Sequence, residues 1–107
     1  MSEVRLPGPV KATLVDAATK APAGGFRFWL YGDEPEGTPP AGLNFRCPCG
    51  CGQLHGIAWR RKDGSPAGWT WDGNRQAPTC SPSIQSFNAD GSKHWHGYLT
   101  AGEWGQA

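Results

Sequence analysis

The sequence predicts an all-β fold, a small antiparallel sheet or sandwich with long, turn-rich loops and little helix. Short aromatic and aliphatic runs alternate with glycine, proline, asparagine and aspartate through most of the 107 residues, a pattern typical of strands joined by turns. The one segment of helix-favouring composition, residues 12–23, keeps no helical period of apolar residues. Six tryptophans supply the apolar surface that a small core needs.

The length fits one domain. We expect residues 1–24 to form an extended N-terminal segment packed on that domain, and residues 25–107 to form a single β-domain. The first strand is predicted at residues 25–31, where alternation places large apolar side chains on both faces. Residues 33–42 contain three prolines and two glycines, so they predict a loop.

Further short strands follow, each bounded by turn residues. The clearest turns are Asp63-Gly64-Ser65-Pro66, Asp72-Gly73-Asn74 and Ala89-Asp90-Gly91-Ser92. The last of these turns predicts a hairpin. The strands are expected at residues 43–46, 54–60, 68–71, 83–88, 93–100 and 102–104.

Cys47-Pro48-Cys49-Gly50-Cys51-Gly52 is the most informative stretch of the chain. Disulfides between cysteines one residue apart are strained, whereas glycines beside cysteines allow the tight turn by which thiolates converge on one ion. The stretch resembles a zinc knuckle, with tighter spacing and no second cysteine pair. We therefore predict a zinc site that staples the β-domain together.

The remaining ligands must come from elsewhere in the chain. His94 and His96 lie two apart on a predicted strand, so both imidazoles can point to the same face and reach the cysteine turn. His55 follows the turn and could support a ligand, and Cys80 is interpreted as a small, buried apolar residue. The candidates are Cys47, Cys49, Cys51, Cys80, His55, His94 and His96.

Two ligand sets are compatible with this spacing, and they share the cysteine turn. The first combines Cys47, Cys49 and Cys51 with His96. The second uses Cys47 and Cys51 with His94 and His96, which avoids crowding three alternating thiolates around one ion. The predicted metal residues are therefore Cys47, Cys49, Cys51, His94 and His96.

Four motifs occur between residues 45 and 104: Cys47-Pro48-Cys49-Gly50-Cys51-Gly52, Trp69-x-Trp71-x-Gly73, Ala77-Pro78-Thr79-Cys80-Ser81-Pro82-Ser83-Ile84 and His96-Gly97-Tyr98-Leu99-Thr100-x-Gly102-x-Trp104. Together they resemble a small uncharacterised family of bacterial and phage proteins, found in phage or prophage genomes and, in some bacteria, beside ubiquitin-like conjugation genes. The resemblance implies no established activity. It implies a zinc site made by the cysteine-rich turn and a later Cys/His pair, and a structural role for the Ser-Pro-Ser-Ile run. The cysteine that usually precedes the histidine is absent here, and His94 lies close to its place.

The residues favour a protein-interaction module with a structural zinc ion over an enzyme, because metal binding adds folding free energy to a small, glycine-rich core. Exposed aromatic residues such as Trp29, Tyr31 or Trp71 could form the surface for a protein partner, whose identity the sequence does not reveal. A signal peptide and an apolar run long enough to span a membrane are both absent from the sequence. We therefore expect a cytoplasmic protein that makes no membrane contact.

Two alternative functions remain open from the sequence. A zinc-dependent hydrolase-like enzyme would need a general base, and Asp72 and Glu103 are the only carboxylates near the motifs. The sequence supports an enzyme with Cys80 as a cysteine nucleophile even less than it supports a zinc-dependent hydrolase. A single-stranded nucleic-acid binder would use aromatic residues interleaved with arginines, but a net charge of only +1 counts against it.

Overall fold

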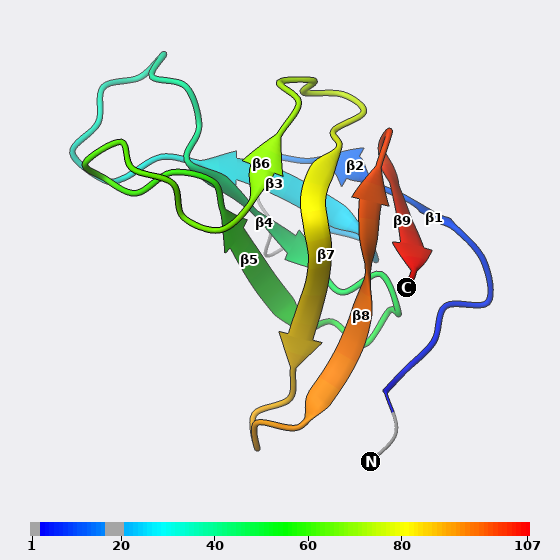
Figure 1. The fold of residues 1–107 in the computed structure, drawn as a ribbon. Helices are drawn as coiled ribbons and strands as arrows, with labels where there is room; N and C mark the ends of the chain where they lie inside the picture. The colour runs from blue at the N-terminus through cyan, green and yellow to red at the C-terminus, as the bar shows by residue number, and fades with distance from the viewer. Residues whose placement is uncertain (1–2, 17–20) are drawn as a thin grey trace.

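Two β-sheets packed face to face make up the computed structural model, which describes residues 3–16 and 21–107. One sheet has the order β1-β9-β8-β7-β6 and the other the order β2-β3-β4-β5 (Figure 1). Within the described residues there is no helix, so the all-β prediction is confirmed. The strands are β1 (Val10–Lys11), β2 (Thr13–Leu14), β3 (Gly25–Trp29), β4 (Gly42–Arg46), β5 (Leu54–Ala58), β6 (Thr70–Trp71), β7 (Cys80–Phe87), β8 (Lys93–Thr100) and β9 (Glu103–Gln106).

The core lies between the two sheets and is formed by residues that alternate along the strands. Phe26, Leu43 and Phe45 come from the β2-β3-β4-β5 sheet and are fully buried. Trp95 and Trp104, equally buried, face them from the other sheet. Because side chains alternate across a strand, the intervening residues of β7 and β8 lie on the outer face of their sheet.

Most strands differ from the predicted ranges at one or both ends, and two of these differences have clear local reasons. The first predicted strand stops at Trp29 rather than residue 31, because Tyr31 begins a turn in which its N–H donates to the Glu34 carboxylate at 2.9 Å. Strand β7 begins at Cys80 rather than residue 83, because Cys80 pairs with Trp71 on one side and with Leu99 on the other. Residues 80–82, which lie before the expected start of this strand, are therefore part of β7.

The N-terminal segment contacts both sheets. Strand β1 pairs antiparallel with β9, and β2 pairs parallel with β3. Between them Ala12 is buried and its N–H donates to the Gly102 carbonyl at 2.8 Å. The segment expected at residues 1–24 includes residues 1–2 and 17–20, which lie outside the described residues. Across the described chain, no helix is long and apolar enough to cross a membrane.

Candidate functional site

The cysteine turn follows directly from β4 and is closed by its own backbone. The Cys47 N–H donates to the Gln53 carbonyl at 2.9 Å, and the Gly50 N–H donates to the Cys47 carbonyl at 3.1 Å. Gly50 and Gly52 have φ angles of 89° and 84°, in the left-handed region that favours glycine. These two glycines let the chain reverse within six residues, which brings the three sulfur atoms to one side of the turn.

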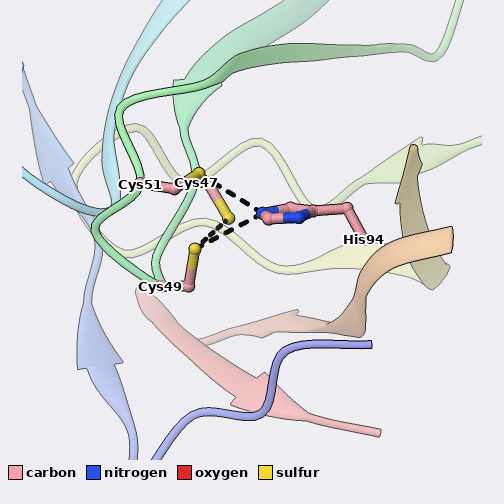
Figure 2. Close-up of side chains that lie close together, drawn as sticks. All are labelled: Cys47, Cys49, Cys51 and His94. Carbon is pink, nitrogen blue, oxygen red and sulfur yellow. Dashed lines mark hydrogen bonds between the residues drawn. The ribbon is translucent and has the colours of Figure 1, made fainter. Parts of the chain in front are cut away.

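Cys47, Cys49 and Cys51 converge with His94 in a compact cluster (Figure 2). The Cys47 and Cys49 sulfurs are 3.1 Å apart, and His94 Nε2 lies 3.4 Å from Cys49 Sγ and 3.3 Å from Cys51 Sγ. All four ligand atoms lie within 4.8 Å of one another. A tetrahedral zinc ion would separate its sulfur and nitrogen ligands by about 3.5 Å, so the cluster could hold a metal ion such as zinc.

Cys47 and His94 are buried in this cluster, whereas Cys49 is partly exposed and Cys51 is exposed. Burial, reinforced by the neighbouring Cys49, raises the pKa of the Cys47 thiol well above its ordinary value, and a bound cation would favour the thiolate instead. The His55 ring centroid lies 6.1 Å from that of His94, and His55 Nε2 is buried without a hydrogen-bond partner among the described residues. Burial lowers the pKa of His55, with a smaller contribution from His94.

A bulge in β8 determines which histidine reaches the cysteines. Ser86 pairs with Trp95, but the next residue of β7 pairs with Lys93, so His94 has no residue opposite it. In a regular strand His94 and His96 would share a face, as the sequence analysis expects. A bulge re-aims a side chain, and here the imidazole of His94 lies among the cysteines while that of His96 lies against β7.

His96 lies against a serine on the outer face of the sheet. The Ser83 Oγ and His96 Nε2 atoms are 2.8 Å apart, and both side chains are partly exposed. A second bulge places Ser83 there, because β7 uses four residue steps between Cys80 and Ile84 where β8 uses two between Leu99 and Gly97. When Nε2 is unprotonated the hydroxyl donates to it, which is the arrangement of a nucleophile and its general base.

The other candidate residues lie away from this chemistry. Cys80 is 3% exposed, and burial together with the charge of Asp72 raises the pKa of its thiol to about 12. Such a thiol is a poor nucleophile at neutral pH. The Asp72 carboxylate accepts hydrogen bonds from the N–H groups of Asn74 and Thr79, so it stabilises a turn.

The structure brings together four of the five predicted metal residues and places His96 elsewhere. Sequence reasoning did not find the contact of His96 with Ser83, since the two residues lie 13 positions apart and Ser83 was interpreted as structural. The number of candidates was the one sign of a second site in the sequence. Seven candidate ligands competed for four positions, so three of them were free for another role.

Comparison with known proteins supplies the family. Residues 19–107 match the family described as bacterial ubiquitination-like system serine protease (BubE). Neither the curated proteins nor the solved structures contain a match to the chain. The family match overturns three expectations: an uncharacterised family without an established activity, an interaction module as the main function, and a binding role in preference to an enzyme. The alternative of a hydrolase-like enzyme is closer to the family description. The chain belongs to the BubE family of serine proteases of bacterial ubiquitination-like systems.

Proposed function

We propose that this chain is a serine peptidase of a bacterial ubiquitination-like system, with Ser83 as its nucleophile and His96 as its general base. The observation that carries the proposal is the 2.8 Å separation between Ser83 Oγ and His96 Nε2. It supplies the pair of residue types that a serine protease requires, and the partly exposed outer face gives a substrate access to it.

In the first half of the reaction, Ser83 Oγ attacks the carbonyl carbon of the scissile peptide bond while its proton passes to His96 Nε2. The carbon–nitrogen bond then breaks, and the leaving amine takes the proton from His96. In the second half His96 removes a proton from water, and the resulting hydroxide attacks the ester. The ester bond breaks, Ser83 regains its proton from His96, and the carboxylic acid product leaves.

The position of His96 is fixed mainly through its backbone. Its carbonyl accepts hydrogen bonds from the Ala107 N–H and from Gln106 Nε2, each at 3.1 Å. Gln85 lies directly opposite His96 in the register of β7 and β8. Among the described residues no carboxylate is within ion-pair distance of His96, so we describe Ser83 and His96 as a dyad rather than a triad.

We further propose that the cluster of Cys47, Cys49, Cys51 and His94 binds zinc in a structural role. Thiolate and imidazole donors suit zinc, and four protein ligands would leave no open position for a water molecule. This site lies at the cysteine turn and not at Ser83, so the peptidase reaction needs no metal-bound step. A bound ion would hold the start of β8 against the turn that follows β4.

A fluorophosphonate probe tests the dyad without knowledge of the substrate. The probe forms a bond between Ser83 Oγ and phosphorus, fluoride leaves, and the hydroxyl proton passes to His96, so labelling reports an activated serine. We expect labelling of the wild-type chain at Ser83, and a loss of at least about a thousandfold in rate in Ser83→Ala and His96→Ala. Ser81→Ala is the matched control, because Ser81 is exposed in the same bulge and should leave labelling intact.

Peptide cleavage completes the test of the proposed function. The wild-type chain should cleave members of a mixture of unstructured octapeptides of random sequence, with the new ends identified by mass spectrometry. A wild-type chain that is neither labelled nor able to cleave any peptide would refute the dyad. Labelling that survives in Ser83→Ala but disappears in Ser81→Ala would move the nucleophile to Ser81.

A further inference from the structure

Strand β7, which carries Ser83, has an edge that is only partly covered. On one side β8 runs along its length. On the other side β6 pairs only with Cys80 and Ser81, at the start of the strand (Figure 1). From Ser83 to Phe87, no strand of the described chain pairs with that side of β7.

The direction of the β8 backbone groups follows from the hydrogen bonds to the chain end. The His96 carbonyl accepts the Ala107 N–H, so the backbone groups of His96 point toward β9. Backbone groups alternate sides along a strand, so those of Gly97, the next residue, point toward β7. There they meet Ile84, which pairs with Gly97 in the register.

The same alternation continues along β7 to the turn. Ile84 and Ser86 point their backbone groups toward β8, and the Asn88 N–H donates on the same side, to the Ser92 carbonyl at 2.8 Å. Gln85 and Phe87 therefore point their N–H and C=O groups away from β8, toward the uncovered edge. No other described residue is hydrogen-bonded to these four groups.

Natural edge strands are commonly blocked by charged side chains, prolines, bulges, covering loops or short length. In β7 the proline (Pro82) and the bulge come before Ile84, so they do not block the edge from Ile84 to Phe87. The segment from Ser81 to Phe87 contains no charged residue, and the side chain of Phe87 is 54% exposed. The edge can therefore accept another strand.

We propose that the substrate binds as an extended, unfolded peptide that adds a strand to this edge of β7. Its backbone would pair with Gln85 and Phe87, a mode of recognition in which main-chain hydrogen bonds provide most of the affinity. Ser83 and Gln85 are two residues apart in β7, which is about 7 Å along a strand. An extended substrate has the same spacing, so its residue opposite Gln85 lies two positions from the residue that reaches Ser83. The inference rests on the proposed peptidase function.

Strand β6 explains how the scissile bond reaches the dyad. Because β6 occupies the edge at Cys80 and Ser81, an added strand cannot continue past Ser83 in the plane of the sheet. The substrate must leave the edge there and pass over the outer face, where the side chains of Ser83 and His96 lie. The bound peptide is thus bent at the residue to be cleaved.

A pair of variants at one position tests the role of the backbone. Phe87→Pro removes the N–H group that faces the edge, a position at which a sheet tolerates proline, and Phe87→Ala removes only the side chain. We expect cleavage of the random octapeptides by Phe87→Pro to be about fivefold slower than by Phe87→Ala, from the loss of one hydrogen bond. Fluorophosphonate labelling should be equal in the two variants, because the probe has no peptide backbone.

Amide exchange provides a second measurement that does not depend on a folded proline variant. In Ser83→Ala, the amides of Gln85 and Phe87 should exchange faster than those of Ile84 and Ser86. They should slow when the octapeptide that the wild-type chain cleaves best is added. Equal cleavage by Phe87→Pro and Phe87→Ala, or exchange that the peptide leaves unchanged, would overturn the edge proposal.

The labelling result separates the two proposals. A wild-type chain that the fluorophosphonate labels at Ser83 but that cleaves no peptide keeps the dyad and overturns peptide binding at the edge. A chain that is not labelled and cleaves nothing refutes the dyad itself, and the edge proposal falls with it.

Discussion

Glu34 and Arg60 show how single residues hold a loop of this protein in place. The two terminal nitrogens of Arg60 donate to the two Glu34 oxygens, each at 2.8 Å. Arg60 also donates to the Pro39 carbonyl, and its guanidinium lies 5.8 Å from the centroid of the Tyr31 ring. The proline-rich segment predicted as a loop is therefore fixed to the chain that follows β5.

This ion pair predicts a pH dependence of stability. The hydrogen bonds from Arg60 lower the pKa of Glu34 from its ordinary 4.5. A depressed folded-state pKa stabilises the fold above the unfolded value, and this contribution is lost as the pH falls through the folded value. Glu34→Gln should therefore lower the thermal midpoint at pH 6 and have a smaller effect at pH 3, as followed by circular dichroism.

Glu36→Gln is the control for this measurement. Glu36 belongs to the same loop and has no ion-pair partner among the residues that the structure describes. Its substitution should change the thermal midpoint little at either pH. An effect of Glu34→Gln that is equal at pH 6 and pH 3 would contradict the role of the ionised carboxylate.

Strand β8 connects the two functional clusters of the molecule. His94 at its start contacts the cysteine turn, and His96 two residues later contacts Ser83. Trp95 between them is fully buried in the core. We therefore expect a change at the cysteine turn to affect the position of His96 through these three consecutive residues of one strand.

Chelation should reveal this connection. Removing the proposed zinc ion from the wild-type chain should lower its thermal midpoint, since structural zinc contributes folding free energy. It should also slow fluorophosphonate labelling of Ser83 about tenfold or more, because small displacements of catalytic groups are costly. Added zinc should restore both. Labelling that is unchanged in the metal-free chain would show that the clusters are independent.

Two cysteine variants provide the matched comparison for chelation. Cys51→Ala removes a sulfur from the cluster and should reduce metal content, as measured by elemental analysis. Cys80→Ala removes a thiol that lies outside the cluster, so it should retain the metal and cost no more than about 2 kcal/mol of stability. Equal metal loss in both variants would contradict the ligand set.

The element that the sequence predicts best is a strand in which apolar and polar residues alternate along most of its length. Strand β8 was predicted with the bounds it has, residues 93–100, because apolar and polar residues alternate along most of it. The bulges in β7 and β8 could not be predicted, since the offset of a bulge exists only between two paired strands. The contact of His94 with the cysteines and the contact of His96 with Ser83 both depend on these bulges. The sequence therefore showed which residue types were candidates, but not which side chains would meet.

At the scale of the whole molecule, Trp104 joins the two sheets. Its ring lies 4.5 Å from the Phe45 ring of the opposite sheet and 5.9 Å from Trp95 in its own sheet, measured between centroids. Its Nε1 donates to the Gly24 carbonyl at 2.8 Å. Two of the six tryptophans that predicted a folded core, Trp95 and Trp104, meet at this junction.

Trp104→Phe should test this junction. The substitution leaves a void and an unpaired carbonyl at Gly24, so we expect a loss of about 2 kcal/mol in the free energy of unfolding. Urea denaturation would measure it. Tyr98→Phe, an exposed position on the neighbouring strand, should change stability by less than about 0.5 kcal/mol. Comparable losses in both variants would contradict the central role of Trp104.

The segment from Val10 to Leu14 crosses from one sheet to the other, since β1 pairs with β9 and β2 pairs with β3. This segment holds the two sheets together at one border. The family match begins at residue 19, after the segment, whereas Ser83, His96 and the cysteine cluster all lie within the match. The joint between the two sheets at this border is therefore built from residues that belong to neither cluster.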